Sequence, residues 1–116
     1  MSYYEMAYFR TSSGRAPVED YLDRMEDVRE RAGVFETLAE FREHGPEAVG
    51  IICRHIEGKL WEIKIDYRAK RHRIFYVVIS GRRLVLLHAY LKKARKAPRR
   101  ELETARRRLN LSERGT

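Results

Sequence analysis

The sequence predicts an α+β fold, with a curved, largely antiparallel sheet, two helices from the first half of the chain and one helix from its end. Three observations lead to this prediction. Apolar residues recur at helical spacing between residues 17 and 44. Between residues 51 and 91 they alternate or form continuous runs, as in strands. Helical spacing returns after Pro98. At 116 residues, we expect a single domain, 1–116.

The first predicted elements are a strand and a helix. The segment from Tyr3 to Phe9 is short, rich in aromatic residues and followed by turn-forming residues 11–14. These features indicate a strand. Pro17 suits the first position of a helix, because its missing N–H would have no partner there. The apolar stripe of this helix is Val18, Tyr21, Leu22 and Met25.

A second helix is predicted from a capping box at residues 27–30 to His44-Gly45-Pro46. Glycine just past the last turn, followed by proline, is a usual helix end. We expect its buried face to contain Val28, Ala32, Phe35, Leu38, and Phe41 or Ala39.

The middle of the chain predicts four strands. The ranges are Ile51–Ile56, Leu60–Tyr67, Arg71–Ile79 and Leu84–Leu91, with a hairpin turn at residues 80–83. Within the second range, Trp61, Ile63, Ile65 and Tyr67 face one way, and Leu60, Glu62, Lys64 and Asp66 face the other. The fourth is nearly all apolar, which favours a strand covered on both faces. A last helix is predicted from Pro98 to about Asn110, with Leu102, Ala105 and Leu109 inside.

Charge is distributed unevenly along the chain. Residues 1–57 contain 7 Lys/Arg and 12 Asp/Glu, a net −5, whereas residues 58–116 contain 18 and 5, a net +13. A positive field of this kind attracts polyanions and speeds their encounter. A nucleic acid is therefore favoured as a partner over a merely solvated basic surface.

Several functional classes lack support in the sequence. No apolar run approaches the roughly 20 residues of a membrane helix, and residues 1–5 do not resemble a signal peptide. The single cysteine, Cys53, fits a reducing cytoplasm, where we expect the protein. There is no phosphate-binding glycine loop, no nucleophile elbow and no pair of Cys or His at metal spacing. We expect no metal and no cofactor.

The candidate site consists of cations on the predicted strands. Lys64 is on the polar face of its strand, and Arg71 and Arg73 share a face of the next. The following basic residues come where the apolar strand ends: Lys92, Lys93, Arg95 and Lys96. If the strands are neighbours, these side chains converge on one face. Each residue alone is more simply a solvated charge, but unpaired charges are unexpected within so apolar a sheet.

Such a cluster suits RNA cleavage. A base takes the proton of the ribose 2′-hydroxyl, cations stabilise the charged phosphorus intermediate, and an acid protonates the leaving oxygen. Crowded like charges lower the pKa of a lysine toward the value a base needs. No metal is required. Composition does not separate this chemistry from simple phosphate binding.

Three stretches of the chain resemble the phage-related HigB-like branch of the RelE/ParE toxin superfamily. They are LWEIKI (60–65), RHRIFY (71–76) and LLHAYLKKARKAP (86–98), and that branch typically reads LWELR, YRIFY and LLHGFxKKTxKTP. Glu101 and Ala105 match its last helix, PVEDYL (17–22) its first helix, and Gly45 a helix end. The resemblance covers about residues 3–110 and is specific in combination.

The resemblance implies a RelE-like fold and ribosome-dependent cleavage of messenger RNA, with no cofactor. It implies catalytic positions for Lys64, Arg73 and Lys93, the last with Lys92 beside it. We also expect His88 in the catalytic set. The residues that we expect to contact RNA are Arg71, Tyr90, Lys92, Arg95 and Lys96. Two positions depart from RelE itself, which has a lysine in place of Glu62 and a tyrosine in place of Arg99. The general base is therefore open among Lys64, His88 and Tyr90.

The resemblance also implies partners. They are the ribosome with its mRNA and an antitoxin, often a helix-turn-helix protein through which the pair would contact operator DNA; no membrane is expected. We also expect an acidic antitoxin to cover the positive face, or to block ribosome entry by bulk. Two other functions stay open: a non-enzymatic ParE-like toxin that poisons DNA gyrase, and a nucleic-acid-binding phage remnant without activity.

Overall fold

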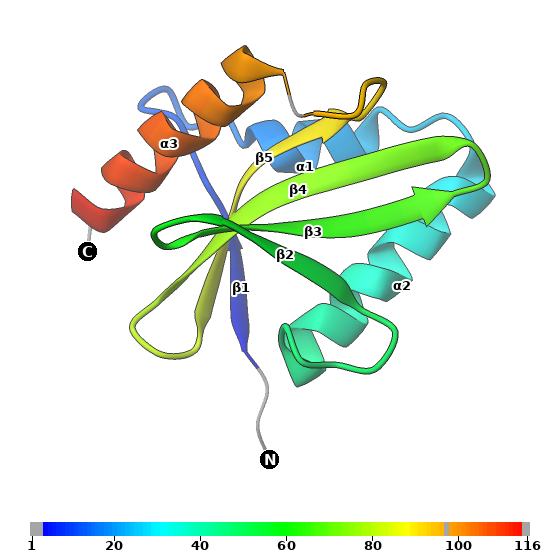
Figure 1. Ribbon diagram of the computed structural model, residues 1–116, viewed down its shortest axis with the longest axis horizontal. Helices are drawn as coiled ribbons and strands as arrows, with labels where there is room; N and C mark the ends of the chain where they lie inside the picture. Colours follow the sequence, from blue (N-terminus) through cyan, green and yellow to red (C-terminus); the bar gives the residue numbers. More distant parts are fainter. Residues whose placement is uncertain (1–3, 97, 115–116) are drawn as a thin grey trace.

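The computed structural model describes residues 4–96 and 98–114 and has an α+β fold with three helices and a five-stranded sheet (Figure 1). The fold class predicted from the sequence is therefore confirmed. In chain order the elements are β1 (Glu5–Tyr8), α1 (Pro17–Asp23), α2 (Val28–His44), β2 (Ile52–Glu57), β3 (Leu60–Tyr67), β4 (Lys70–Ile79), β5 (Arg83–Leu91) and α3 (Arg99–Arg114).

The sheet has the strand order β1-β5-β4-β3-β2. The three pairs from β2 to β5 are antiparallel hairpins between consecutive strands. Strand β1 pairs with β5 in parallel, with Glu5 opposite Arg83 and Tyr8 opposite Leu86. The expected hairpin turn is present, because Ser80 and Gly81 have φ angles of 53° and 82°, the left-handed values that a tight hairpin needs. The sheet is mixed but largely antiparallel.

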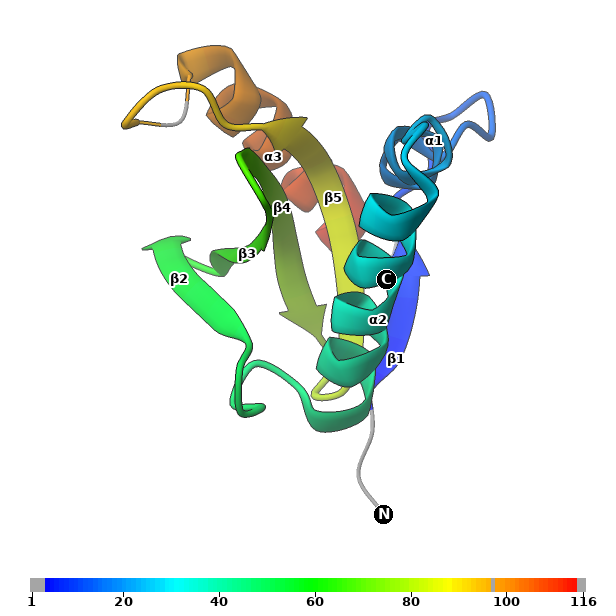
Figure 2. The same cartoon turned by 90° about the vertical axis from the view of Figure 1, so that its right-hand side faces the viewer.

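Helices α1 and α2 cover one face of this twisted sheet (Figure 2). The buried cluster between them contains Val18, Leu22, Met25, Val34, Leu38, Phe41, Ile63, Ile65, Ile74, Tyr76, Leu84 and Leu86. Even-numbered residues of β4 and the first half of β5 supply this face, as the two-residue period of a strand requires.

Helix α3 lies against the opposite face. The cluster below it contains Phe9, Leu60, Phe75, Val77, Val85, Leu87, Tyr90 and Ala105, with Leu102 and Leu109 packed beside it. The predicted inner stripe of α3 and the covering of β5 on both faces are therefore correct. Because α3 covers only part of this face, the polar residues at the far ends of β3, β4 and β5 remain outside the cluster.

The predicted buried face of α2 was partly wrong. Leu38 and Phe41 are buried, but Val28 and Phe35 are 67% and 40% exposed. Ala32 and Ala39 are exposed as well. The buried stripe is Glu30, Val34, Leu38 and Phe41. The predicted and the observed stripes both have helical spacing. The observed stripe begins with the charged residue Glu30, so the pattern of apolar residues did not indicate it.

Several element ends differ from the prediction. Strand β1 begins at Glu5, and Tyr3 lies outside the described residues. Helix α3 begins at Arg99, after the carbonyl of Pro98 accepts from the N–H of Glu101, and it continues beyond Asn110 to Arg114. The helix end at Gly45 is as predicted: this residue has φ 79°, and a Cβ there would collide with the ring of Tyr4. Among the described helices, none has the length and hydropathy of a membrane span.

Candidate nucleic-acid interface

Two cross-strand rows of side chains form the candidate site, on the sheet face that α3 partly covers. In the first, Lys64 of β3 is directly opposite Arg73 of β4, which is opposite Tyr90 of β5. In the second, Arg54 of β2 is opposite Glu62 of β3, which is opposite Phe75 and then His88. Directly opposite residues share a face, so each row is a line of neighbours.

A third row extends this face toward the end of the strands. Arg71 is opposite Asp66, and its carbonyl accepts from the backbone N–H of Lys92, 2.8 Å away. The strands β2, β3 and β4 and the residue directly after β5 thus bring five cations onto one face. We call them the cationic patch: Arg54, Lys64, Arg71, Arg73 and Lys92. Arg71 and Arg73 share a face, as the sequence predicted.

A β-bulge determines which residues of β5 reach the patch. Phe75 pairs with His88 but Tyr76 pairs with Leu86, so Leu87 is the extra residue. Before the bulge the odd-numbered Val85 faces α3, and after it the even-numbered Tyr90 does. The bulge therefore reverses the alternation.

Lys92, and not Lys93, lies on the same side of the chain as Tyr90, because side chains two residues apart in an extended segment point the same way. Its charge interacts with Arg73, Glu62, Arg54 and Lys64. Lys93 is exposed, and no contact among the described residues joins it to Arg73. Arg95 and Lys96 are also exposed in the segment before α3. Of the basic residues predicted after β5, only Lys92 joins the cationic patch.

Arg73 is the most enclosed cation of the patch. Its side chain is 6% exposed, and Nη1 donates to Asp66 Oδ1 at 2.6 Å and to the carbonyl of His72 at 2.9 Å. Its buried Nε has no hydrogen-bond partner among the described residues. Buried donors are normally paired. The guanidinium is thus fixed in direction while keeping unused donor capacity.

The environment of Lys92 lowers the pKa of its ammonium group. Burial and then the charge of Arg73 lower the pKa of Lys92 below its usual range, and Arg54 and Lys64 act in the same direction. Glu62 opposes them. Lys92 therefore loses its proton more readily than an isolated lysine would.

Tyr90 and Glu62 lie between the cations on the same face of the sheet, and we call these two residues the floor of the patch. Both are buried, and the Tyr90 hydroxyl donates to Glu62 Oε2 at 3.3 Å. Burial and then the negative charge of Glu62 raise the pKa of Tyr90 above its ordinary value. Tyr90 therefore keeps its proton, and the carboxylate supplies a negative charge beneath the patch.

Both ring nitrogens of His88 have partners. Nε2 is 2.7 Å from Glu101 Oε1 on α3, and Nδ1 is 3.2 Å from Arg108 Nη1. Because arginine only donates, Nδ1 accepts and the Nε2–H donates to the carboxylate. Burial lowers the pKa of His88, and the ring stacks against Phe75 and Tyr90. His88 is thus neutral and connects α3 to Phe75 and Tyr90 of the sheet.

Sequence reasoning missed three parts of the site. It did not include Arg54, the floor carboxylate Glu62 or the counter-ion Asp66. Alternation along β3 and β4 could have indicated Asp66 and Glu62. The pairing of Arg54 depends on the β2–β3 register, which contains an irregularity between His55 and Glu57.

A second polar network lies on the opposite face of the sheet. The Tyr21 hydroxyl of α1 is 2.7 Å from His72 Nδ1 on β4, and His72 Nε2 is 2.5 Å from Glu30 Oε2 on α2. Lys70 Nζ donates to the other oxygen of Glu30 at 3.3 Å. His72 and Glu30 are both buried. The network joins three elements, and both ring nitrogens of His72 have a partner in it.

Metal-ligand side chains gather at one place among the described residues. Glu40, Glu43 and His44 on α2 bring ligand atoms within 4.8 Å of one another, and all three are exposed. Helix α2 is on the opposite side of the sheet from the cationic patch.

A protein-family model matches the part of the chain that contains the cationic patch. The model of the family described as Phage derived protein Gp49-like (DUF891) matches residues 20–110, which include α2, the strands β2 to β5 and most of α3. No curated protein matches the chain. The matched range is most of the sequence and contains every residue of the cationic patch. The chain belongs to the phage-derived Gp49-like family.

Proposed function

We propose that this protein is the toxin of a toxin–antitoxin pair, a metal-independent endoribonuclease that cuts messenger RNA on the ribosome. The observation that carries the proposal is the cationic patch, in which Lys64 of β3 and Arg73 of β4 come together with Lys92, the residue directly after β5. Membership of a phage-derived family and the resemblance of residues 60–98 to HigB-like toxins support it.

The patch supplies the groups that cleavage by internal transfer needs. Neutral Lys92 accepts the proton of the ribose 2′-hydroxyl as its oxygen bonds to phosphorus. Arg73 and Lys64 stabilise the charge that accumulates on the phosphate oxygens. Lys64, as an ammonium, then gives a proton to the leaving 5′-oxygen as the phosphorus–oxygen bond breaks. The products are a 2′,3′-cyclic phosphate and a free 5′-hydroxyl.

The remaining residues position this chemistry. Asp66 holds Arg73 through Nη1, and Tyr90 with Glu62 forms the floor. We assign a positioning role to His88, because Glu101 and Arg108 engage both ring nitrogens. Arg71 extends the patch for a neighbouring phosphate. Lys93, Arg95 and Lys96 are exposed and would contact RNA or ribosome outside the reacting phosphate.

Ribosome dependence and an antitoxin complete the proposal. The patch has many cations but few groups to align a ribose, so the decoding site would orient the 2′-hydroxyl for in-line attack. An antitoxin, of the helix-turn-helix type in the resembling branch, would neutralise the protein in the cytoplasm. Contact with operator DNA would occur only through that antitoxin.

The chemical identity of the cleaved ends tests this proposal. Purified protein is added to ribosomes carrying a defined message, and the ends are mapped and analysed. We expect cuts only with ribosomes, ending in a cyclic phosphate and a 5′-hydroxyl. A single 2′-deoxy nucleotide at the cut site should abolish that cut. Lys64→Ala and Lys92→Ala should each slow cleavage by about 10²- to 10³-fold.

Lys59→Ala is the matched control. Lys59 is a lysine in the β2–β3 turn, 71% exposed and paired with Glu113, so its loss should leave cleavage unchanged. Cleavage that tolerates the 2′-deoxy nucleotide would contradict attack by the 2′-hydroxyl. Intact messages together with broken chromosomes in growing cells would favour gyrase poisoning instead.

A further inference from the structure

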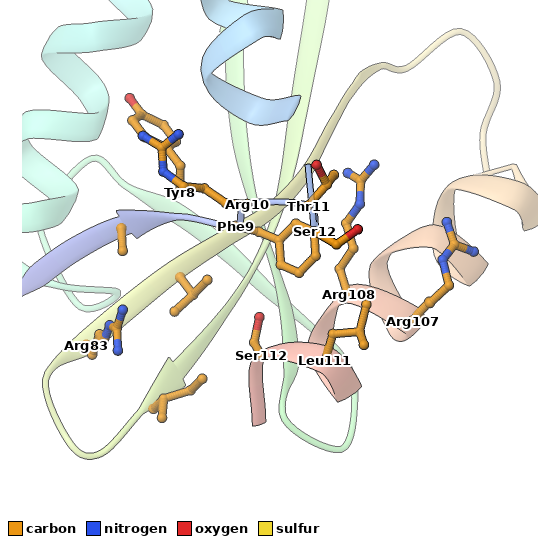
Figure 3. A pocket seen from close by; sticks show the side chains of 13 residues that line it. Tyr8, Phe9, Arg10, Thr11, Ser12, Arg83, Arg107, Arg108, Leu111 and Ser112 are labelled. Carbon is orange, nitrogen blue, oxygen red and sulfur yellow. The ribbon is translucent and has the colours of Figure 1, made fainter. Parts of the chain in front are cut away.

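A groove lies between strand β1, the start of β5 and the last turns of α3. Its volume is about 970 Å³. Figure 3 shows Phe9 at its centre, with Leu111 and Ser112 of α3 on one side and Arg83 of β5 on the other. None of the residues of the cationic patch lines it. The proposed function does not use this surface.

The floor of the groove is apolar. Phe9 and Val85 are 8% and 6% exposed, and Ile79 lines the same space. Leu111 lines it from α3 and is 49% exposed, although most residues of this helix are charged or polar. An exposed leucine beside buried apolar side chains forms a surface on which other apolar side chains can pack.

The lining carries positive charge without acidic residues. Four arginines line the groove, namely Arg10, Arg83, Arg107 and Arg108, and no Asp or Glu does. Arg10 and Arg83 have only long, exposed ion pairs, at 4.0 and 3.6 Å. Within the described residues, neither Arg107 nor Arg108 has an ion pair with a carboxylate. The groove therefore has an excess of cations.

We propose that this groove binds an acidic amphipathic helix of a partner protein. Leucine-like side chains on one face of that helix pack on Phe9, Val85 and Leu111. Carboxylates along its edges pair with the arginines, of which Arg107 is exposed and available. An apolar groove that takes the apolar face of a helix is a common mode of peptide recognition, and the charge of the rim selects an acidic one.

The groove suits a protein segment better than RNA. Single-stranded nucleic acids bind by stacking bases on exposed aromatic faces. The aromatic ring on the floor, Phe9, is buried, and the Arg108 guanidinium lies over it with its carbon 5.5 Å from the ring centroid. Arg108 is held there by a hydrogen bond to the carbonyl of Leu87 at 3.0 Å. Tyr8 also lines the groove, but it packs against the apolar cluster on the opposite face of the sheet. The other apolar residues of the lining are aliphatic.

A titration followed by NMR of the isotope-labelled full chain tests the proposal. The probe is a synthetic amphipathic peptide of about 16 residues, with leucines at i, i+3, i+4 and i+7 and glutamates beside them. We expect saturable binding with shifts gathered on Phe9, Val85 and Leu111. The same peptide with lysine for glutamate should not bind.

Substitutions at exposed positions locate the site without risk to folding. Arg107→Glu and Leu111→Ser should each weaken binding of the acidic peptide about tenfold. Arg100→Glu makes the same charge change on the same helix outside the groove and should leave the affinity unchanged.

Four results would overturn the proposal. They are no saturable binding of the acidic peptide, equal binding of the lysine peptide, shifts that fall on Lys64 and Lys92 instead of the groove, and equal loss of affinity in Arg100→Glu. Perturbation of Phe9 and Leu111 by a short oligouridine, in preference to the peptide, would identify the groove as an RNA surface instead.

Discussion

At the scale of single residues, the properties of Lys92 come from its surroundings. One extra residue in β5, Leu87, turns Lys92 to the face that holds Arg73. Burial and the charge of Arg73 then lower its pKa. The bulge thus converts one of many cations into a candidate base.

Arg54 provides a test of this effect, because it lowers the pKa of Lys92 from the neighbouring strand β2. Neutral lysine is the active form, so the cleavage rate should rise with pH through the pKa of Lys92. Arg54→Gln removes a cation and therefore raises that pKa. The pH profile of cleavage should move to higher pH, with a rate about threefold lower at pH 7.

The control for this measurement is Lys59→Gln, which removes one charge from the β2–β3 turn and should leave the profile in place. A rate that falls equally at every pH in Arg54→Gln would show that Arg54 contacts RNA rather than setting the pKa of Lys92.

The candidate site could be predicted from the sequence only up to the bulge. Two-residue alternation placed Lys64, Arg71 and Arg73 on their strands, and the structure brings these three together. The same reasoning could not decide between Lys92 and Lys93, since a bulge leaves no signal in the pattern of apolar residues. Glu62 and Asp66 were visible as polar positions, but their partners depend on tertiary contacts.

At the scale of elements, polar contacts position the two helices on the sheet. Asp27 caps α2 by accepting from the N–H groups of Arg29 and Glu30. The Glu30 side chain points instead into the interior, where it meets His72 and Lys70. A capping box would have turned it back toward the helix start. This carboxylate sets how α2 lies against β4.

Replacing Glu30 should therefore be costly. Glu30→Ala leaves buried His72 without its Nε2 partner, and we expect the free energy of unfolding to fall by about 3 kcal/mol. Urea denaturation followed by circular dichroism measures the change. Glu36→Ala, an exposed position of the same helix, should change it by less than about 0.5 kcal/mol. Equal effects of the two substitutions would mean that the Glu30–His72 contact contributes little.

The elements themselves were largely predictable, because each is encoded locally. Pro17, Gly45 and Pro98 lie at or next to helix ends, and continuous apolar residues indicated β5. The face of α2 was not predictable, since a buried charge such as Glu30 is favourable only once a partner from β4 is present. The parallel pairing of β1 with β5 also depends on contacts distant in sequence.

At the scale of the whole molecule, the sheet separates two surfaces of different character. One face is covered by the acidic first half of the chain, through α1 and α2. The other carries α3 and the cationic patch, which, apart from Arg54, come from the half with net charge +13. The positive field is therefore concentrated on the side where the patch is open.

This arrangement predicts a local salt dependence of RNA binding. For single strands, each neutralised phosphate contributes about 0.7 to the slope of log affinity against log salt. With a 2′-O-methyl oligonucleotide, which resists cleavage, Arg71→Gln and Lys64→Gln should each reduce the slope by about 0.7. Fluorescence anisotropy at several salt concentrations measures it. Arg10→Gln, in the groove, should not change the slope; three equal reductions would indicate diffuse binding over the whole surface.

The pairing of β1 with β5 has a consequence for folding during translation. Residues 5–8 form their ladder only with residues 83–86, so the N-terminal strand emerges from the ribosome long before its neighbour is synthesised. Until then the apolar sides of α1 and α2 have no completed sheet to cover. We infer that the nascent chain stays unfolded through most of translation. The polypeptide would then acquire its cationic surface only once translation is nearly complete.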